Sequence, residues 1–185
     1  MLSPLQIKKQ THFFNILDFD RSGTIEEDDF EAIGDNLSIV RDFDMDTVEY
    51  ETVMRLTKGI WGNLVPFVKG TQGTQEQWLQ FMTVLLADEN EDKYDKYVRQ
   101  FVSTLFKLFD INEDGYISQT EYIDLFIGLR IEVRFAPKAF RNLDTNNDGK
   151  LSHDEIIQSV DEFMKDSDPK APGNWLFGDW EGTVV

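Results

Sequence analysis

The chain has 185 residues, with 35 acidic and 18 basic side chains, so its formal net charge is −17. Its content of 41% hydrophobic and 13% aromatic residues is enough to bury a core, which argues against overall disorder. Carboxylates in this excess repel phosphate and anionic lipid and attract cations, so we expect divalent cations as partners and neither nucleic acid nor membrane. The absence of cysteine from the sequence excludes disulfides, thiolate metal sites and cysteine nucleophiles.

The first residues predict the start of a helix rather than a signal peptide. Ser3 is a good N-cap, Pro4 suits the first helical position, and Gln6 stands where the partner in a capping box belongs. The segment lacks the apolar region of a signal peptide, and no apolar run approaches the ~20 residues that span a bilayer. We therefore expect a soluble, cytoplasmic protein.

Three segments share one pattern, in which an apolar helical stripe, a loop rich in Asp, Asn and Gly, and a second apolar stripe follow one another. Their loops begin at Asp18, Asp110 and Asp144. Two apolar residues three apart precede each loop: Phe14 and Leu17, Phe106 and Phe109, and Phe140 and Leu143. The sequence thus predicts a repeat of helix–loop–helix units, and we expect the 15 phenylalanines to form most of its core.

A fourth unit is expected because such units bury their apolar faces in pairs. The stretch from Tyr50 to Ala87 has two apolar stripes around a loop, 66–75, that contains no carboxylate, so we interpret it as a degenerate unit without a cation site. The predicted fold is all-α and compact, with four units in two pairs. The first pair covers residues 1–87 and the second 92–185, and the charged run from Asp88 to Lys93 links them.

The third and fourth loops match the EF-hand calcium pattern D-x-[DN]-x-[DN]-G-x5-E along their full length. Ca²⁺ prefers six to eight oxygen ligands, which side chains at positions 1, 3, 5 and 12 and the carbonyl at position 7 supply. The expected ligands of the third loop are Asp110, Asn112, Asp114, the carbonyl of Tyr116, and Glu121. Those of the fourth loop are Asp144, Asn146, Asp148, the carbonyl of Lys150, and Glu155.

The first loop matches this pattern except at its last position, where Asp29 replaces glutamate. Its expected ligands are Asp18, Asp20, Ser22, the carbonyl of Thr24, and Asp29. Aspartate is one methylene shorter than glutamate, so binding a cation through both oxygens is harder, and single-oxygen ligation favours the smaller, octahedral Mg²⁺. We therefore expect three Ca²⁺ sites in the chain, with Mg²⁺ competing best at the first.

Two details of the third and fourth loops follow from their registers. Ile117 and Leu151 occupy position 8, where a short antiparallel β-bridge would join the two loops. Ser118 and Ser152 at position 9 are expected to cap the outgoing helices, in each case with a glutamate three residues on.

The segment from Asp168 is not helical by composition, yet it concentrates large apolar side chains. Trp175, Leu176, Phe177 and Trp180 lie within six residues of one another. Burial of such side chains is worth on the order of a few kcal/mol each, so we expect the tail 168–185 to dock onto the helical body.

The remaining candidate residues do not predict an enzyme. His12 is expected on the surface of the first helix, and His153, at position 10 of the fourth loop, is expected to be a solvent-facing spectator. No Ser/His/Asp set, glycine-rich phosphate loop or separate carboxylate pair stands apart from the cation loops. The informative carboxylates are those assigned to cation binding.

The chain resembles the sarcoplasmic calcium-binding proteins of invertebrates and bacterial calerythrin. The shared features are four units of which the second is degenerate, a first loop that ends in Asp29, and the closing segment from Gly173 to Gly178. The resemblance covers essentially the whole chain. It implies a compact body of two EF-hand pairs, three occupied sites, and a role in buffering cytosolic Ca²⁺ and Mg²⁺.

Two other functions remain open within the calcium-binding class. A sensor would expose a surface for a protein target, but sensors of this kind use Met-rich grooves, and this chain has 5 Met against 24 aromatic residues. A luciferin-binding or photoprotein-like carrier would hold a hydrophobic small molecule. Photoproteins resemble one another in using several histidines, including one near the C-terminus, and this chain has none after His153. We favour a monomeric buffer.

Overall fold

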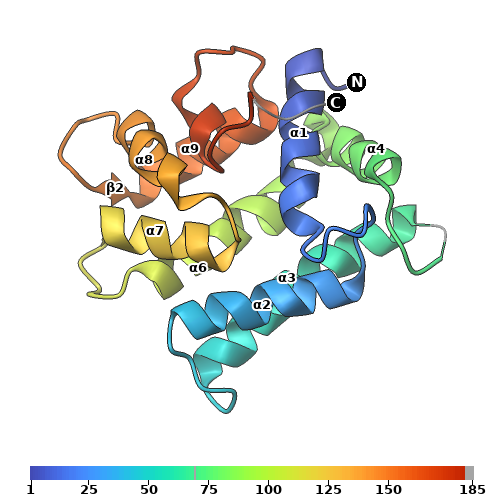
Figure 1. Ribbon diagram of the computed structural model, residues 1–185. Helices are drawn as coiled ribbons and strands as arrows, with labels where there is room; N and C mark the ends of the chain where they lie inside the picture. Colours follow the sequence, from blue (N-terminus) through green and yellow to red (C-terminus); the bar gives the residue numbers. More distant parts are fainter. Residues whose placement is uncertain (69, 182–185) are drawn as a thin grey trace.

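The computed structural model describes residues 1–68 and 70–181, and its architecture is all-α with four EF-hand units in two pairs (Figure 1). The first pair comprises α1 (Pro4–Leu17), α2 (Glu27–Val40), α3 (Val48–Leu64), the 3-10 turn η1 (Val65–Phe67) and α4 (Gln75–Leu85). The second pair comprises α6 (Gln100–Phe109), β1 (Tyr116–Ile117), α7 (Gln119–Gly128), η4 (Val133–Phe135), α8 (Ala136–Leu143), β2 (Leu151–Ser152) and α9 (His153–Lys165). Between them lie η2 (Asp88–Asn90), α5 (Glu91–Tyr94) and the π-helical turn η3 (Asp95–Arg99). Among the described residues, no helix combines the length and apolar character needed to cross a bilayer.

The predicted helix starts are confirmed by their caps. Ser3 Oγ accepts from the Gln6 backbone N–H at 3.2 Å, and Gln6 Oε1 accepts from the Ser3 N–H at 2.8 Å. Ser118 and Ser152 form the same reciprocal boxes with Glu121 and Glu155. Each box satisfies backbone donors that the first turn of a helix leaves unpaired.

Short backbone bridges join the loops within each pair. Ile117 pairs with Leu151 in the antiparallel ladder of β1 and β2, as their position 8 predicts. In the first pair, Ile25 and Gly73 exchange backbone hydrogen bonds of 2.9 and 2.7 Å. A Cβ on Gly73 would lie 3.1 Å from Cγ1 of Ile25, so a glycine permits the close approach. The loop without carboxylates thus supports the first loop directly.

Large aromatic side chains fill the core, as their helical spacing predicts. Phe30, Phe126 and Phe163 are inaccessible to solvent, and Trp78 and Tyr122 are nearly so. The two halves share this core, because α2 packs against α7 and α1 packs against α9 (Figure 1).

The charged segment between the pairs is held in a fixed geometry by α9. The fully buried Tyr94 donates its hydroxyl hydrogen to Asp161 at 2.9 Å, and the Arg99 guanidinium binds the same carboxylate at 2.7 Å. Arg99 also binds Glu91 at 2.8 Å. These bonds tie the linking segment to the last long helix rather than leaving it as a free spacer.

The chain leaves α9 after Lys165 and folds back across the helices through η5 (Pro172–Trp175). Leu176 and Trp180 are 3% and 5% exposed. Lys9 is fully buried in α1, and its ammonium donates to the carbonyls of Glu162 and Asp166 and to Oδ1 of Asn174, at 2.7–2.9 Å. One buried cation thus joins α1, the carboxyl end of α9 and the tail. Residues 182–185 of the tail lie outside the described residues.

The two histidines differ: His12 is covered by a tertiary neighbour, against expectation, whereas the His153 side chain is 43% exposed, as expected, and also makes tertiary contacts. His12 is half-buried under the tail and donates from Nε2 to the carbonyl of Phe177 at 2.8 Å, and burial lowers its pKa. His153 Nε2 lies 2.9 Å from Ser103 Oγ, and its ring meets Phe106 edge-on. Neither contact is local in sequence.

Candidate cation sites

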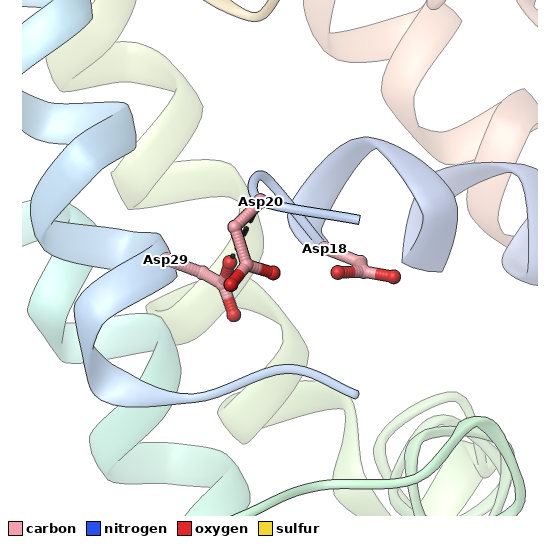
Figure 2. A group of neighbouring side chains, drawn as sticks. All are labelled: Asp18, Asp20 and Asp29. Carbon is pink, nitrogen blue, oxygen red and sulfur yellow. Dashed lines mark hydrogen bonds between the residues drawn. The ribbon is translucent and has the colours of Figure 1, made fainter. Parts of the chain in front are cut away.

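Three carboxylates of the first loop converge on one point. One oxygen from each of Asp18, Asp20 and Asp29 lies within 4.8 Å of the others. Figure 2 shows Asp18 at the carboxyl end of α1 and Asp29 reaching back from the first turn of α2. Asp18 and Asp29 are buried whereas Asp20 is exposed, and burial raises the pKa of Asp29 against the opposing effect of its backbone hydrogen bonds. Like charges held this close are suited to a divalent cation.

The same hydrogen bonds shape all three carboxylate-bearing loops, beginning with the aspartate at position 1. Asp18 accepts the backbone N–H groups of positions 5 and 6 at 2.8 and 2.9 Å. Asp110 and Asp144 accept the equivalent pair at 3.1 and 2.9 Å. At position 3, Asp20, Asn112 and Asn146 each accept the N–H of position 5 at 2.8–3.0 Å. Side chains at the predicted ligand positions therefore already face the inside of each loop.

Position 12 closes each loop by joining its two ends. Asp29 accepts from the N–H groups of Phe19 at 2.9 Å and Glu26 at 2.8 Å. Glu121 accepts from the corresponding positions 2 and 9 of its loop at 2.7 Å each. Glu155 does so at 3.1 and 2.9 Å. Asp29 is shorter than glutamate, yet it makes the same closing bonds.

The backbone turns are also alike. Position 4 is left-handed in each loop, with φ of 62° at Arg21, 55° at Glu113 and 58° at Asn147. Position 6 has φ of 82–89° and is glycine in all three, as this conformation favours. This common turn directs successive oxygens toward one centre.

The remaining predicted ligands lie in the same loops, with two contacts that sequence reasoning missed. Ser22 Oγ donates to the carbonyl of Thr24 at 3.0 Å, so two expected ligands of the first loop are hydrogen-bonded to each other. Lys150, expected to serve only through its carbonyl, reaches across the β-bridge and binds Oδ2 of Asp114 at 2.7 Å. This ion pair lowers the pKa of Asp114. The antiparallel register, which places position 7 of one loop near the other loop, is the signal that could have indicated it.

Among the described residues of the second hand, 48–68 and 70–85, no comparable set of donors comes together. Near its loop, Gln72 donates to Glu26 Oε1 at 2.8 Å, and the adjacent surface hollow is lined mostly by Thr and Gln side chains. In the other three loops every expected donor is an oxygen, so the donor set fits a hard cation such as Ca²⁺ or Mg²⁺.

A separate apolar cavity of about 100 Å³ lies between the two halves. Leu37, Phe106, Leu125 and Val160 are among its lining residues, and it reaches Glu121 and Tyr122 next to the third loop. Tyr122 donates its hydroxyl hydrogen to the carbonyl of Leu176 at 2.6 Å. Burial raises the pKa of this hydroxyl. The cavity therefore has almost entirely apolar walls.

Comparison with known proteins places these features in a family context. A model of an EF-hand domain pair matches residues 100–127, and an EF-hand model matches residues 138–165. The sarcoplasmic calcium-binding protein of Hediste diversicolor is 32% identical over 167 residues, covering 90% of this chain and 94% of that protein. Calerythrin of Saccharopolyspora erythraea is 28% identical over 153 residues, covering 81% of this chain and 86% of calerythrin.

Solved structures show the same fold at lower identity. A calcium-binding protein of Streptomyces coelicolor superposes with a TM-score of 0.73 at 17% identity, covering 88% of this chain and 99% of that one. The coelenterazine-binding protein of Renilla muelleri gives 0.71 at 19% identity, covering 96% and 99%.

Proposed function

The chain belongs to the sarcoplasmic calcium-binding protein family, whose EF-hands bind calcium, and we propose that it acts as a monomeric cytoplasmic buffer of Ca²⁺ and Mg²⁺ with three cation sites. The observation that carries this proposal is the repetition of one hydrogen-bond pattern around three sets of oxygen donors. The ligands are those expected from the sequence in the first, third and fourth loops. The second hand serves as the structural partner of the first.

The first site is the one where Mg²⁺ competes best. Asp29 reaches the loop centre with a short side chain, which favours ligation through one oxygen and hence an octahedral shell. Magnesium is known in loops of this fold, because all three calcium loops of the photoprotein berovin are described as binding it. That likeness, at 17% identity, supports the proposal through the fold alone.

A buffer is favoured over a sensor because the apolar interior is already covered. The linking segment is tied to α9 through Tyr94 and Arg99, and the tail buries Leu176 and Trp180. Sensor EF-hands open on calcium binding to expose a groove, whereas buffer EF-hands barely open. These contacts of the linking segment and the tail with the helical body would have to break before such a groove could open.

Titration with Ca²⁺ in millimolar Mg²⁺, followed by calorimetry and by a dye that fluoresces on apolar surface, tests this proposal. We expect three ions per chain, none between Val65 and Gln77, and no rise in dye fluorescence. Any stoichiometry other than three, or an ion bound between Val65 and Gln77, would overturn the site assignment. Dye binding that appears at micromolar Ca²⁺ would replace the buffer with a sensor.

The cavity between the halves supports a second candidate function, that of a carrier for an apolar small molecule. Relatives include the luciferin-binding protein of Renilla reniformis, 24% identical over 165 residues. A cavity of about 100 Å³ with apolar walls would take a compact, neutral, aromatic group. Binding of such a probe, abolished when Leu125→Trp fills the cavity and retained in Ile127→Trp on the exposed face of the same helix, would support this function. Equal binding to both variants would exclude the cavity as the site.

A further inference from the structure

The outgoing helices of the first and third hands are packed directly on each other, although they belong to different pairs. Asn36 on α2 donates from Nδ2 to the carbonyls of Gly128 at 2.7 Å and Ile127 at 3.2 Å, at the carboxyl end of α7. A Cβ added to Gly128 would lie 2.5 Å from Cδ2 of Leu37. The two helices therefore approach closely, and α2 cannot shift along α7 without breaking these contacts.

Two arginines extend this contact toward the loops, one from each hand. Arg130 follows α7, and its guanidinium lies 3.9 Å from the ring centre of Phe19 and donates to the Phe19 carbonyl at 3.4 Å. Arg41 follows α2, and it donates from Nε to the carbonyl of Leu108 at 2.9 Å and lies 5.6 Å from the ring of Phe109. Each arginine thus follows the outgoing helix of one hand. Arg130 contacts position 2 of the first loop, and Arg41 contacts the last two residues of α6, directly before the third loop.

These contacts reach groups that shape the cation loops. Phe19 is position 2 of the first loop, and its N–H donates to Asp29 Oδ1 at 2.9 Å. Its ring is 7% exposed under Arg130. Phe109 is 3% exposed and immediately precedes Asp110, the first ligand position of the third loop. Arg130 itself is held at φ of 53°, a conformation that non-glycine residues rarely adopt without supporting contacts.

From this geometry we propose that the first and third cation sites are energetically coupled through a joint made by Arg41 and Arg130, so that filling either site raises the affinity of the other. The inference rests on the proposed cation sites. The second hand carries no site, so the bridge from Ile25 to Gly73 gives the first site no cation-binding partner within its own pair. A cation bound at position 12 restrains the start of the outgoing helix, and the arginine that follows that helix contacts the other hand at or directly before its loop.

Coupling must be reciprocal, and this requirement makes it measurable. The backbone amide resonances of Gly23, Gly115 and Gly149 report the three loops separately, because each glycine donates its N–H to the position 1 aspartate of its own loop. Glu121→Gln weakens the third site and should lower Ca²⁺ affinity at the first by about fivefold or more, the lower end of typical coupling. Asp29→Asn weakens the first site and should lower affinity at the third by the same factor.

Two controls separate this joint from other routes. Glu155→Gln weakens the fourth site and should leave the first site's affinity within about twofold of wild type. In Arg41→Ala/Arg130→Ala, affinity at the first site should no longer respond to Glu121→Gln, whereas Arg134→Ala, which removes a neighbouring exposed arginine, should preserve the response. If the double variant does not fold by circular dichroism, Arg130→Lys serves instead, because it keeps the charge but loses the planar contact.

The outcomes are distinguishable. Cation-induced shifts at Gly23 and Gly115 with affinities that ignore Glu121→Gln and Asp29→Asn would overturn the coupling while leaving the proposed function intact. Coupling that persists undiminished in a folded Arg41→Ala/Arg130→Ala variant would overturn the joint. No shift at either glycine in the wild-type protein would remove the proposed sites and the coupling together.

Discussion

Lys150 Nζ lies 2.7 Å from Oδ2 of Asp114, so a side chain of the fourth loop neutralises a carboxylate of the third. The same ammonium lies 4.8 Å from the ring centre of Tyr116. Asp114 is an expected ligand, and a positive charge at this distance opposes the approach of a divalent cation. The pair is partly exposed to solvent, which moderates its strength.

Lys150→Met should therefore tighten Ca²⁺ binding at the third loop. We expect an affinity higher by about two- to fivefold, in keeping with the modest strength of exposed ion pairs. The shift of the Gly115 amide resonance during a calcium titration measures it. Lys58→Met is the matched control, because it removes the same charge from an exposed pair with Glu31 in the other half. An equal gain in both variants would attribute the effect to net charge alone.

Asp29→Glu should raise the preference of the first site for Ca²⁺ over Mg²⁺ severalfold. The longer side chain restores the reach needed to bind the larger ion through both oxygens. Competitive titration of the Gly23 amide with the two ions gives the ratio directly. Glu121→Asp is the converse change and should lower the same ratio at the third site. A Ca²⁺/Mg²⁺ ratio that does not move in either variant would contradict this account of position 12.

Removal of cations should lower the melting temperature. Three Ca²⁺ ions carry +6, so filling all three sites changes the formal charge from −17 to −17 + 6 = −11 and relieves repulsion among the loop carboxylates. Binding to the folded chain also stabilises it by mass action. Scanning calorimetry with and without a chelator measures the difference, and equal melting temperatures would be inconsistent with three sites.

The substitution Gly173→Ala, which adds one methyl group, tests whether docking of the tail stabilises the protein. A Cβ at Gly173 would lie 2.3 Å from the Ser159 carbonyl oxygen and 2.8 Å from its Cα, and backbone atoms cannot move aside cheaply. Gly173→Ala should thus displace the tail, lower stability by several kcal/mol and increase binding of an apolar dye, since Leu176 and Trp180 lose their burial.

The controls for this substitution lie in α3. A Cβ at Gly59 or Gly62 meets nothing within 4 Å. Gly59→Ala and Gly62→Ala should each stabilise the protein by about 0.5–1 kcal/mol through helix propensity. Truncation after Ser167 should reproduce the dye binding of Gly173→Ala, and a truncated chain as stable as wild type would refute a structural role for the tail.

The buried ammonium of Lys9 should make the free energy of unfolding rise with pH in the alkaline range. Burial lowers the pKa of its ammonium from 10.5 to about 8, against the opposing attraction of Asp166 and Glu162. Between pH 8 and 10.5 the unfolded chain therefore binds more protons at this group than the folded chain, so its contribution to stability rises with pH across that window.

The comparison with Lys9→Met isolates this group. The free energy of unfolding of wild type, relative to Lys9→Met, should increase by up to about 3 kcal/mol between pH 8 and 10.5. Lys8→Met removes the same charge from the neighbouring position of the same helix, where the ammonium donates to the Glu181 carbonyl and lies 5.5 Å from the Trp180 ring centre, and serves as the control. A difference that is flat across this pH range would show that Lys9 keeps its ordinary pKa.

Elements that close over short distances in the chain can be predicted from the amino-acid sequence. A loop of the EF-hand type turns back on itself within 12 residues, so its aspartates, its glycine and its position 12 carboxylate meet through local backbone geometry. Caps such as Ser118 and Ser152, and the bridge of Ile117 with Leu151, follow from register in the same way. Helical spacing of apolar residues likewise indicates which faces are buried.

Contacts between residues far apart in the chain, by contrast, depend on how the helices and the tail pack. The contacts of His12 with Phe177, Lys9 with Asn174 and Arg130 with Phe19 span more than 100 residues each. Such pairs depend on how the two halves and the tail pack together. No short sequence pattern encodes that arrangement, because the position of a residue on its helix does not say whether a distant segment will cover it. The ligand positions of the loops could therefore be predicted from the sequence, whereas the joint made by Arg41 and Arg130 is visible only in the packed structure.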